Sequence, residues 1–166
     1  MSIYAHTPEN YSCPFCRLAN GDSMLPEQTQ HEDVVYHDDH VTAFIGLYWW
    51  PNNPGHVIIV PNHHIENIYD LTPDIAVYVH ELARQVALAF KELEIYAAQG
   101  TSTRQHNEPA GYQEVFHYHL HVFPRYKYDY LYDLTFQRRL TTVDERRPYA
   151  EKLKRYFDGK RIEVTL

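Results

Sequence analysis

Three histidines at alternating positions in one apolar segment constrain the fold of this chain more than any other feature. His117, His119 and His121 lie within residues 114–125. A period of two is typical of a β-strand, because successive side chains point to opposite faces of a sheet. The imidazoles would then stand in a row on one face, about 6.5 to 7 Å apart. We expect Pro124 to end the strand, since it has no backbone N–H to share. The opposite face would pack on a core through Phe116, Tyr118, Leu120 and Val122.

A row of imidazoles has two chemical uses and one purely structural explanation. Imidazole binds metal ions and titrates near neutral pH, so the row could be a metal site or a nucleophile with acid and base groups beside it. The structural explanation is a polar sheet face that happens to be rich in histidine, of which the chain has 12. The apolar character of the rest of the segment favours a functional site.

Length and composition are those of an ordinary globular domain. With 44% hydrophobic and 22% charged residues, a chain of 166 residues can bury one core, and we expect a single domain over residues 1–166. The N-terminal residues lack the basic and apolar regions of a secretory signal, and no apolar run reaches about 18 residues. The net charge of −7 argues against binding to nucleic acid or acidic lipid. We therefore expect a cytoplasmic protein with no nucleic-acid or membrane partner.

The two cysteines, Cys13 and Cys16, have the spacing Cys-x-x-Cys. In a reducing compartment such a pair is more often half of a metal site or a redox couple than a disulfide. The strand and helix alternation of a thioredoxin-like motif does not surround the pair, which favours a metal. Residues 13–21 should form a short helical turn that ends at Gly21.

The rest of the chain alternates between short apolar runs and amphipathic segments. Thr72, Pro73 and Asp74 are a helix start signal, with a hydroxyl at the N-cap, proline at N1 and an acid in the first turn. We expect strands at residues 34–36, 41–45, 55–61, 95–103 and 114–125, and helices at residues 62–71, 72–94 and 144–158.

Three further segments leave alternatives open. Residues 46–55 contain both tryptophans among prolines and glycines, and we expect core or dimer contacts for the indoles rather than ligand stacking. Tyrosines alternate through residues 126–132, so an extended segment would present all their rings on one side. That side could face a partner subunit, overhang the ligand site or be an amphipathic edge. Residues 161–166 are either a last strand or a frayed end.

The histidine segment resembles the signature of the histidine-triad (HIT) family, His-φ-His-φ-His-φ-φ, where φ is an apolar residue. The run from His117 to Phe123 fits this pattern, and Gln113 precedes it as in that family. The resemblance covers residues 11–126 and leaves residues 127–166 as a C-terminal extension. It implies an α+β fold, an antiparallel sheet of about five strands with one long and one short helix, extended across a homodimer. It also implies a small-molecule nucleotide as the partner.

The same resemblance implies roles for the site residues. His119, the middle histidine, would be the nucleophile that attacks the α-phosphorus of a nucleoside phosphate and carries the nucleotide until water releases it. His121 and His56 would contact the phosphate and assist the leaving group, and Gln113 and Asn107 would make further contacts on the phosphate side. Dinucleoside polyphosphates and nucleoside phosphoramidates both fit this reaction.

The resemblance extends to a zinc-bearing, bacterial-type branch of the family, similar to dinucleoside polyphosphate hydrolases. In that branch the Cys-x-x-Cys pair shares a zinc ion with two histidines. The matching residues here are Cys13, Cys16, His64 and His117, with His63 as a rival for His64. Four protein ligands leave no open position, so this zinc would be structural.

The resemblance also implies a nucleobase slot and shows two departures from the family pattern. Glu114 stands where the family has a small hydroxyl residue, and the strand period points its side chain away from the histidines. Gly46 stands where the family has an aspartate for the ribose. The slot residues, for each of which ordinary core is the alternative, are Phe15, Leu18, Phe44, Ile45 and Ile58.

These observations support three hypotheses. The first is a nucleotide hydrolase or nucleotidyl transferase that works through a covalent nucleotidyl-histidine. The second is a metal-dependent hydrolase whose ligands are the three histidines. The third is a nucleotide-binding protein with a degenerate site, which the departures at Gly46 and Glu114 would explain.

Overall fold

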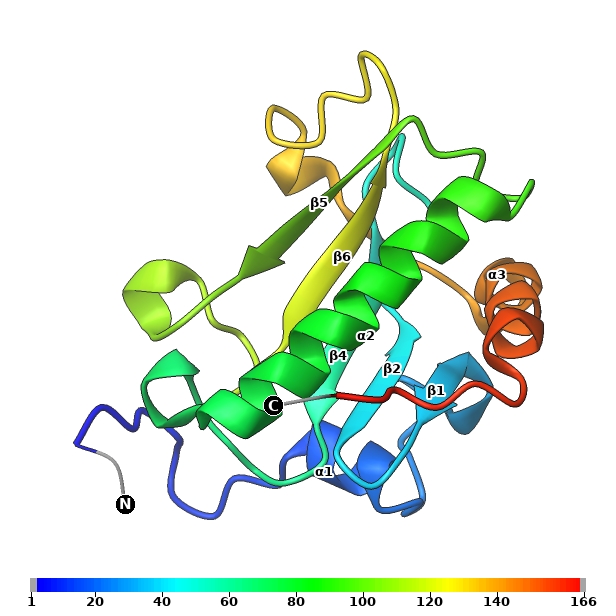
Figure 1. Cartoon of the computed structure of the whole chain (residues 1–166). Helices are drawn as coiled ribbons and strands as arrows, with labels where there is room; N and C mark the ends of the chain where they lie inside the picture. Colours follow the sequence, from blue (N-terminus) through cyan, green and yellow to red (C-terminus); the bar gives the residue numbers. More distant parts are fainter. Residues whose placement is uncertain (1–2, 165–166) are drawn as a thin grey trace.

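A five-stranded antiparallel sheet forms the centre of the protein in the computed structural model, which describes residues 3–164 (Figure 1). The strands lie in the order β1-β2-β4-β6-β5. Their bounds are Val34–His37 (β1), Val41–Ile45 (β2), Val57–Pro61 (β4), Gly100–Gln105 (β5) and Leu120–Arg125 (β6). The predicted α+β fold is confirmed. β5 begins later than expected, because residues 94–96 turn after the long helix.

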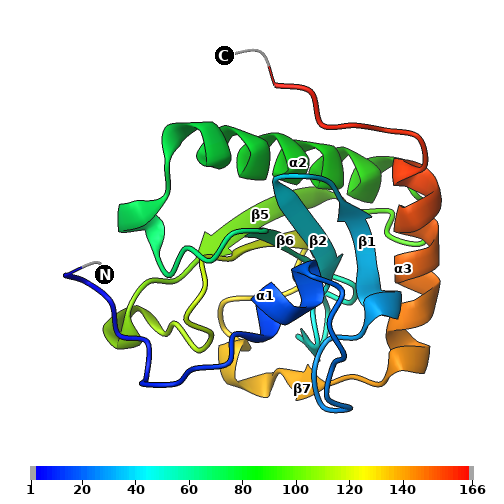
Figure 2. The ribbon, with the colours of Figure 1, turned by 90° about the horizontal axis from the view of Figure 1, so that it is seen from below.

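Within the described residues, three α-helices pack around the sheet: Pro14–Ala19 (α1), Pro73–Glu92 (α2) and Val143–Phe157 (α3). α2 starts at the predicted proline, with Thr72 as its N-cap. Figure 2 shows α2 on one side of the sheet and α1 on the other. No helix within residues 3–164 is long and apolar enough to cross a membrane.

The main core lies between α2 and the sheet. The inner side of α2 buries residues three or four positions apart, among them Val79, Leu82, Val86 and Phe90. Alternate residues of two central strands meet them: Val57 and Ile59 of β4, and Leu120 and Val122 of β6. Because side chains alternate along a strand, Ile58 and His121 point to the opposite face. That face carries the candidate site.

The histidine strand is shorter than predicted, because β6 begins only at Leu120. The backbone before it turns, and the His117 N–H donates to the Val115 carbonyl at 2.8 Å. Phe116 therefore leaves the main core and packs edge-on against Tyr11, with ring centroids 5.5 Å apart. The prediction of one regular strand face from residue 114 onward was wrong.

Pro124 does not end the strand, which continues to Arg125. β4 pairs with β6 only at residues 120–122, so Pro124 has a neighbouring strand, β5, on one side only. Proline is tolerated at such a position, because no strand on the other side requires its missing N–H.

The helix predicted at residues 62–71 is wrong. Only a 3-10 turn forms there, Ile68–Asp70 (η2), and Ile68 is 46% exposed rather than buried. Asparagine side chains take backbone bonds that a helix would need: Asn67 Oδ1 accepts from the turn at 3.0 Å, and Asn107 Oδ1 accepts from the Ile68 N–H at 2.8 Å. Asparagine often competes with helix formation in this way.

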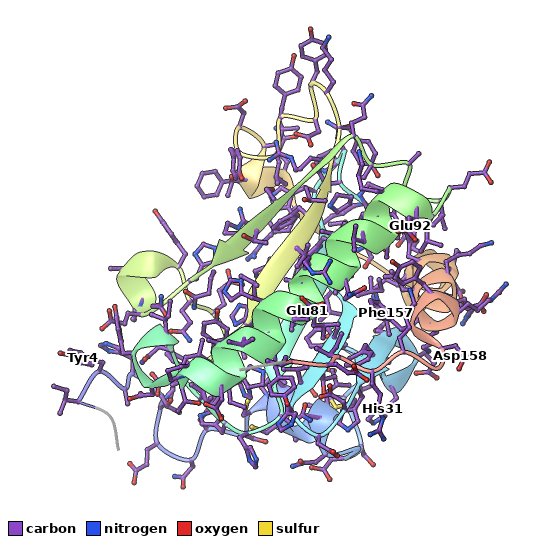
Figure 3. The ribbon with its side chains drawn as sticks, viewed as in Figure 1. Tyr4, His31, Glu81, Glu92, Phe157 and Asp158 are labelled. Atoms are coloured by element: carbon purple, nitrogen blue, oxygen red, sulfur yellow. The ribbon has the colours of Figure 1, made fainter. Side chains whose placement is uncertain are left out.

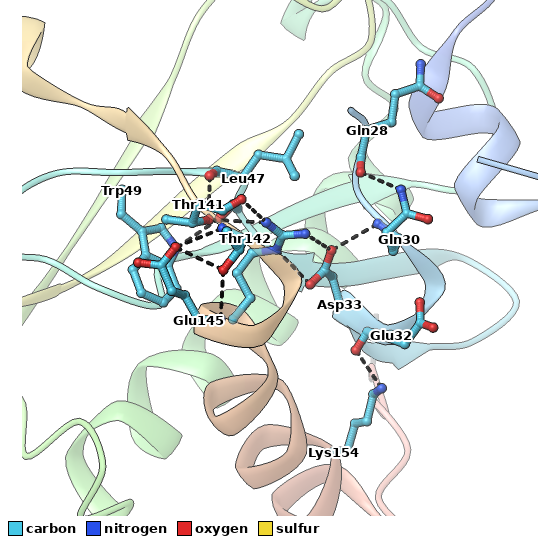
Figure 4. Close-up of polar contacts among 12 residues, drawn as sticks. Gln28, Gln30, Glu32, Asp33, Leu47, Trp49, Thr141, Thr142, Glu145 and Lys154 are labelled. Atoms are coloured by element: carbon cyan, nitrogen blue, oxygen red, sulfur yellow. Dashed lines mark hydrogen bonds and ion pairs between the residues drawn. The ribbon is translucent and has the colours of Figure 1, made fainter. Parts of the chain in front are cut away.

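The C-terminal extension is attached to the start of the sheet. α3 begins with a capping box formed by Thr142 and Glu145. Arg146 of α3 holds the carboxylate of Asp33, at the end of the 3-10 turn His31–Asp33 (η1). Asp33, Thr142 and Glu145 are labelled in Figure 4. Phe157, at the end of α3 beside Asp158, is shown in Figure 3. Its ring packs against Tyr36 of β1 at 5.5 Å.

The tyrosine alternation does not form an extended segment. Tyr128 and Tyr130 have positive φ angles of 67° and 53°. Between them Asp129 is buried and paired with Arg125. The segment is therefore not extended, although the Tyr128 and Tyr130 rings are stacked with their centroids 6.5 Å apart. Tyr126 instead packs against the core.

The C-terminal tail forms no strand over residues 158–164. It is not frayed there either, because Ile162 is buried and its N–H donates to the Tyr36 hydroxyl at 3.0 Å. Residues 165 and 166, the end of the predicted last strand, lie outside the described residues.

Candidate functional site

A cavity of about 860 Å³ lies on the sheet face opposite α2. This volume is in the range of about 300 to 1,000 Å³ that small-molecule sites have. The sheet contributes Phe44, Ile58 and His121 to the lining, and residues 104–119 and 132–138 add side chains from outside the central strands. The cavity thus combines the histidine segment with part of the C-terminal extension.

His119 has one ring nitrogen occupied by the backbone. Its Nδ1 lies 2.7 Å from the His117 carbonyl oxygen. A carbonyl oxygen can only accept, so Nδ1 carries the proton and Nε2 has the lone pair. The ring is 6% exposed and lines the cavity, and burial lowers its pKa to about 4. His119 is therefore neutral at pH 7, in the form that can act as a nucleophile.

His121 and His56 form a second imidazole pair beside it. His121 Nδ1 lies 3.2 Å from His56 Nε2, and the two rings are stacked at 5.3 Å. Burial lowers the pKa of His56 to about 3 and holds the pKa of His121 well below its ordinary value. His56 Nδ1 is buried and has no hydrogen-bond partner within residues 3–164. Both rings are neutral, and one of them donates to the other.

Gln113 and Asn107 do not line the cavity. The Gln113 amide spans two backbone groups: it accepts from the Glu108 N–H at 2.8 Å and donates to the Glu66 carbonyl at 2.6 Å. Asn107 binds the turn η2, as described above. Gln113 does not reach the histidine face, because the backbone is irregular before β6. Both amides hold loop backbone in this structure, and their contact with phosphate stays a prediction.

The predicted nucleobase slot is only partly formed. Phe15, Phe44 and Ile58 line the cavity. Leu18 and Ile45 do not: Leu18 is 3% exposed in a small core behind Phe15, and Ile45 belongs to the main core on the α2 side. Phe44 and Ile45 are neighbours on one strand and must face opposite sides, so their joint assignment to the slot was wrong.

Glu114 lines the cavity, contrary to the prediction that it points away. Its carboxylate lies 2.5 Å from Arg138 Nη2 of the C-terminal extension. The strand period fails at this position because the strand has not yet begun. A small sheet of Tyr48–Trp49 (β3) and Arg139–Leu140 (β7) holds this part of the extension over the site.

Sequence reasoning missed two residues that line the cavity near the histidines, Arg104 and His106. Trp50 and Tyr132, for which contact with a ligand was an open alternative, line it as well. His106 Nδ1 donates to the Gly111 carbonyl at 2.5 Å, and its ring lies 6.3 Å from that of His121. Arg104 is the cross-strand partner of His121 in the β5–β6 pair. The register of that pair is the signal that would have found it. Trp49 and Trp50 are buried as expected, although Trp50 also contacts the cavity.

Gly46 has a steric explanation. A Cβ atom at this position would lie 2.2 Å from His56 Cε1. The His56 ring therefore occupies the space of any larger side chain, including the aspartate that the family pattern has there. The position of the His56 ring therefore explains why residue 46 is a glycine here.

The Cys-x-x-Cys pair meets two histidines at the edge of the sheet. The ligand atoms of Cys13, Cys16, His64 and His117 all lie within 4.8 Å of one another, and His63 is not part of this group. The Sγ to Nδ1 distances are 3.3 Å for Cys13 to His117 and for Cys16 to His64. Ligand atoms around a tetrahedral zinc, with bonds of about 2.3 Å to sulfur and 2.0 Å to nitrogen, lie about 3.5 Å apart.

The orientation of His117 also fits a metal. Its Nε2 lies 2.9 Å from the Pro61 carbonyl oxygen, so Nε2 carries the proton and the Nδ1 lone pair points at the thiols. A backbone acceptor on the second nitrogen is the usual partner of a metal-bound histidine. The donor set and its geometry therefore fit a closed zinc site.

Comparison with known proteins places this site in a family. The sequence matches the HIT domain profile over residues 27–128. Protein hit of Bacillus subtilis (strain 168) is 34% identical over 121 residues, which cover 73% of this chain and 74% of that protein. The purine nucleoside phosphoramidase of Escherichia coli (strain K12) is 36% identical over 92 residues, which cover 54% of this chain and 73% of that protein.

A solved structure supports the same fold. The zinc-bound histidine triad family protein from Mycobacterium smegmatis superimposes with a TM-score of 0.70 at 24% identity, over 89% of this chain and 94% of that one. The profile match, the relatives and the three-dimensional likeness agree with the histidine pattern and its surroundings. The chain belongs to the HIT family.

Proposed function

We propose that this protein is a nucleotide hydrolase or nucleotidyl transferase that cleaves nucleoside phosphoanhydrides or phosphoramidates at the α-phosphorus. The observation that supports this most is the state of His119. Its ring is neutral, lines the cavity, and has Nδ1 bound to a backbone carbonyl, so that Nε2 is the reactive nitrogen. The similarity to the purine nucleoside phosphoramidase of E. coli supports the substrate class.

The reaction would have two steps. In the first, the Nε2 lone pair of His119 attacks the α-phosphorus and forms an N–P bond, while the bond to the leaving oxygen or nitrogen breaks. The leaving group departs with that electron pair and takes up a proton. The hydrogen bond from Nδ1 to the His117 carbonyl stabilises the positive charge on the modified ring. In the second step, water or an acceptor attacks phosphorus, loses a proton and breaks the N–P bond.

The remaining cavity residues would bind the substrate. Phe15, Phe44 and Ile58 form an apolar surface for the nucleobase. The linked His121 and His56 rings would donate to phosphate oxygens and move a proton toward the leaving group. Because His121 neighbours His119, at 5.1 Å between ring centroids, both can contact one phosphate.

The metal-dependent alternative has no geometric support. Within residues 3–164, the group close enough to share a metal ion includes His117 but neither His119 nor His121. His117 turns toward the thiols, and Nδ1 of His119 is bound to a carbonyl. The three imidazoles therefore do not converge on a common centre.

We propose that Cys13, Cys16, His64 and His117 hold one structural zinc ion, which would cross-link α1 to the histidine segment. Phe15 of α1 contacts both the His117 and the His119 rings edge-on, at 5.9 and 5.4 Å. The metal site would thus hold one wall of the cavity. Elemental analysis should find one zinc per chain in the parent and much less in Cys16→Ser.

We also propose that the protein is a homodimer. The outer face of α2 exposes Val77 and Leu88, at 38% and 37%. A second copy packed there would bury both side chains. Light scattering of the purified protein measures the mass directly, and a monomer at micromolar concentration would contradict the proposal.

The experiment for the activity traps the intermediate. The protein is incubated briefly with a dinucleoside polyphosphate or a nucleoside phosphoramidate, quenched, digested and analysed by mass spectrometry. We expect a nucleotide on His119, and a loss of turnover of about a thousandfold or more in His119→Asn. His80→Asn, at an exposed site on α2, is the matched control. Absence of both turnover and adduct would favour a degenerate binding protein instead.

A further inference from the structure

Arg104 is a cation at the cavity that has no role in the reaction proposed above. It lies on β5 opposite His121 of β6, so the two side chains share the cavity face of the sheet. Its guanidinium carbon stands 4.8 Å from the centre of the Trp50 ring and 5.0 Å from that of Phe123. These two aromatic contacts hold the head group in place beside the catalytic histidines.

No carboxylate compensates this charge in the described part of the chain. Arg104 Nε is buried without a hydrogen-bond partner, and the ion pairs within residues 3–164 do not include Arg104. Arg125 and Arg146 each bind a buried aspartate through two nitrogens. Arg104 is half-buried, with its Nε shielded from water. A partly shielded cation without a counter-ion is unfavourable, so its position at the cavity points to an anion from outside the protein.

The surroundings strengthen this conclusion. Burial lowers the pKa of Arg104, and the nearby Arg138 acts in the same direction. Three carboxylates line the cavity, Glu27, Glu114 and Asp133. Glu114 is bound to Arg138, and within residues 3–164 none of the three forms an ion pair with Arg104. Arg104 stays protonated, because guanidinium does not lose its proton in proteins. It therefore brings an uncompensated positive charge to this part of the cavity.

The order of the strands says which part of a substrate would meet Arg104. Phe44 and Ile58, the base slot, lie on β2 and β4, His121 lies on β6 and Arg104 on β5. The sheet order is β2-β4-β6-β5 across this face. A nucleotide with its base in the slot and its α-phosphorus at the histidines must extend its leaving group toward β5.

We propose that Arg104 is the leaving-group subsite and selects substrates whose leaving group begins with a phosphate. The inference rests on the proposed function and narrows it: anhydrides are preferred over phosphoramidates that release an uncharged amine. Tyr132 and Phe136 of the C-terminal extension, 58% and 94% exposed at the cavity, would then contact whatever the leaving phosphate carries. Guanidinium is suited to this task because it binds phosphate oxygens through two nitrogens.

The test compares two substrates that share one nucleoside, a dinucleoside polyphosphate and an unsubstituted phosphoramidate. Arg104→Met keeps the apolar contact with Trp50 and Phe123 but removes the charge. We expect the ratio of kcat/KM, anhydride over phosphoramidate, to fall about 30-fold or more in Arg104→Met. The ratio should fall less in Arg104→Lys and stay as in the parent in Arg155→Met, at an exposed site on α3. An unchanged ratio in Arg104→Met would overturn the proposal, even if both rates fell.

A second measurement separates this inference from the proposed function. Calorimetric titration with inorganic pyrophosphate should show binding to the parent that weakens about tenfold or more in Arg104→Met. If pyrophosphate binding is lost in Arg104→Met and the parent turns over neither substrate, the anion subsite is supported and the proposed activity is contradicted. Turnover with equal pyrophosphate affinity in parent and variant supports the activity and refutes the subsite.

Discussion

Two arginines from different regions show how this protein uses buried charge. Arg146 donates to Asp33 through Nε and Nη2 at 2.8 and 2.9 Å and to the Thr141 carbonyl through Nη1 at 2.6 Å. Arg104, in the cavity, has aromatic contacts and no ion pair in the described part of the chain. One charge is satisfied by the protein itself, and the other, on our proposal, is satisfied by a phosphate of the ligand.

The same difference appears among buried polar atoms. Three buried side-chain atoms lack a hydrogen-bond partner within residues 3–164: Asn53 Oδ1, His56 Nδ1 and Arg104 Nε. Two of these belong to residues that line the cavity. Buried polar groups are normally paired, and exceptions need a reason. We propose that the two cavity atoms serve substrate binding, whereas the Arg146–Asp33 pair holds α3 against the start of the sheet.

The largest change in the free energy of unfolding is expected when the paired Arg146 is replaced. Arg146→Met would leave the Asp33 carboxylate buried without a partner and lower the free energy of unfolding by about 3 to 5 kcal/mol. Urea denaturation followed by circular dichroism measures this. Arg147→Met, the neighbouring exposed position on α3, should change it by less than about 1 kcal/mol. If Arg146→Met and Arg147→Met were equally stable, the Asp33 pair would not be what attaches the extension.

A moderate effect on the free energy of unfolding is expected from the protonation of histidines in the cavity. The pKa of His56 is about 3 in the folded protein, below the value of about 6.5 in an unfolded chain. Between these values the unfolded state binds the extra proton, so stability falls as pH decreases from about 6.5 toward 3, by up to about 1.4 kcal/mol per pH unit. His121 shifts in the same direction.

His56→Asn should reduce this pH dependence, and His80→Asn should leave it unchanged. The free energy of unfolding at several pH values between 5 and 7 gives the slope for each variant. A slope in His56→Asn equal to that of the parent would mean that the His56 ring is not held neutral by burial.

The smallest change in the free energy of unfolding, opposite in sign to the others, is expected when the unpaired Arg104 is replaced. Without ligand, Arg104→Met should leave the free energy of unfolding unchanged or raise it by up to about 1 kcal/mol, because it removes an unpaired cation and keeps the aromatic packing. With pyrophosphate present, the thermal midpoint of the parent should rise and that of the variant should not. A loss of stability comparable to that of Arg146→Met would remove the distinction between the two arginines.

Many of the helices and strands could be predicted from local sequence patterns. The proline and acid at the start of α2, the apolar runs of β1, β2 and β4, and the alternation from Leu120 onward each act within a few residues, and each formed close to its expected place. The Cys-x-x-Cys pair and its two histidine partners were also identified, because the resemblance supplied the distant half of the set. Local periodicity decided neither the choice between His63 and His64 nor the turn before β6.

By itself the sequence determined the chemistry that is available: a row of imidazoles, two thiols and an apolar slot. The tertiary structure decided which groups act together. Arg104 is 17 positions from His121 in the chain, and only the register of β5 with β6 makes them neighbours. The His56 ring fills the space beside Gly46, a contact that no local sequence pattern reveals. Strand pairing and burial are properties of distant segments, and whether a charge is paired depends on them rather than on its neighbours in sequence.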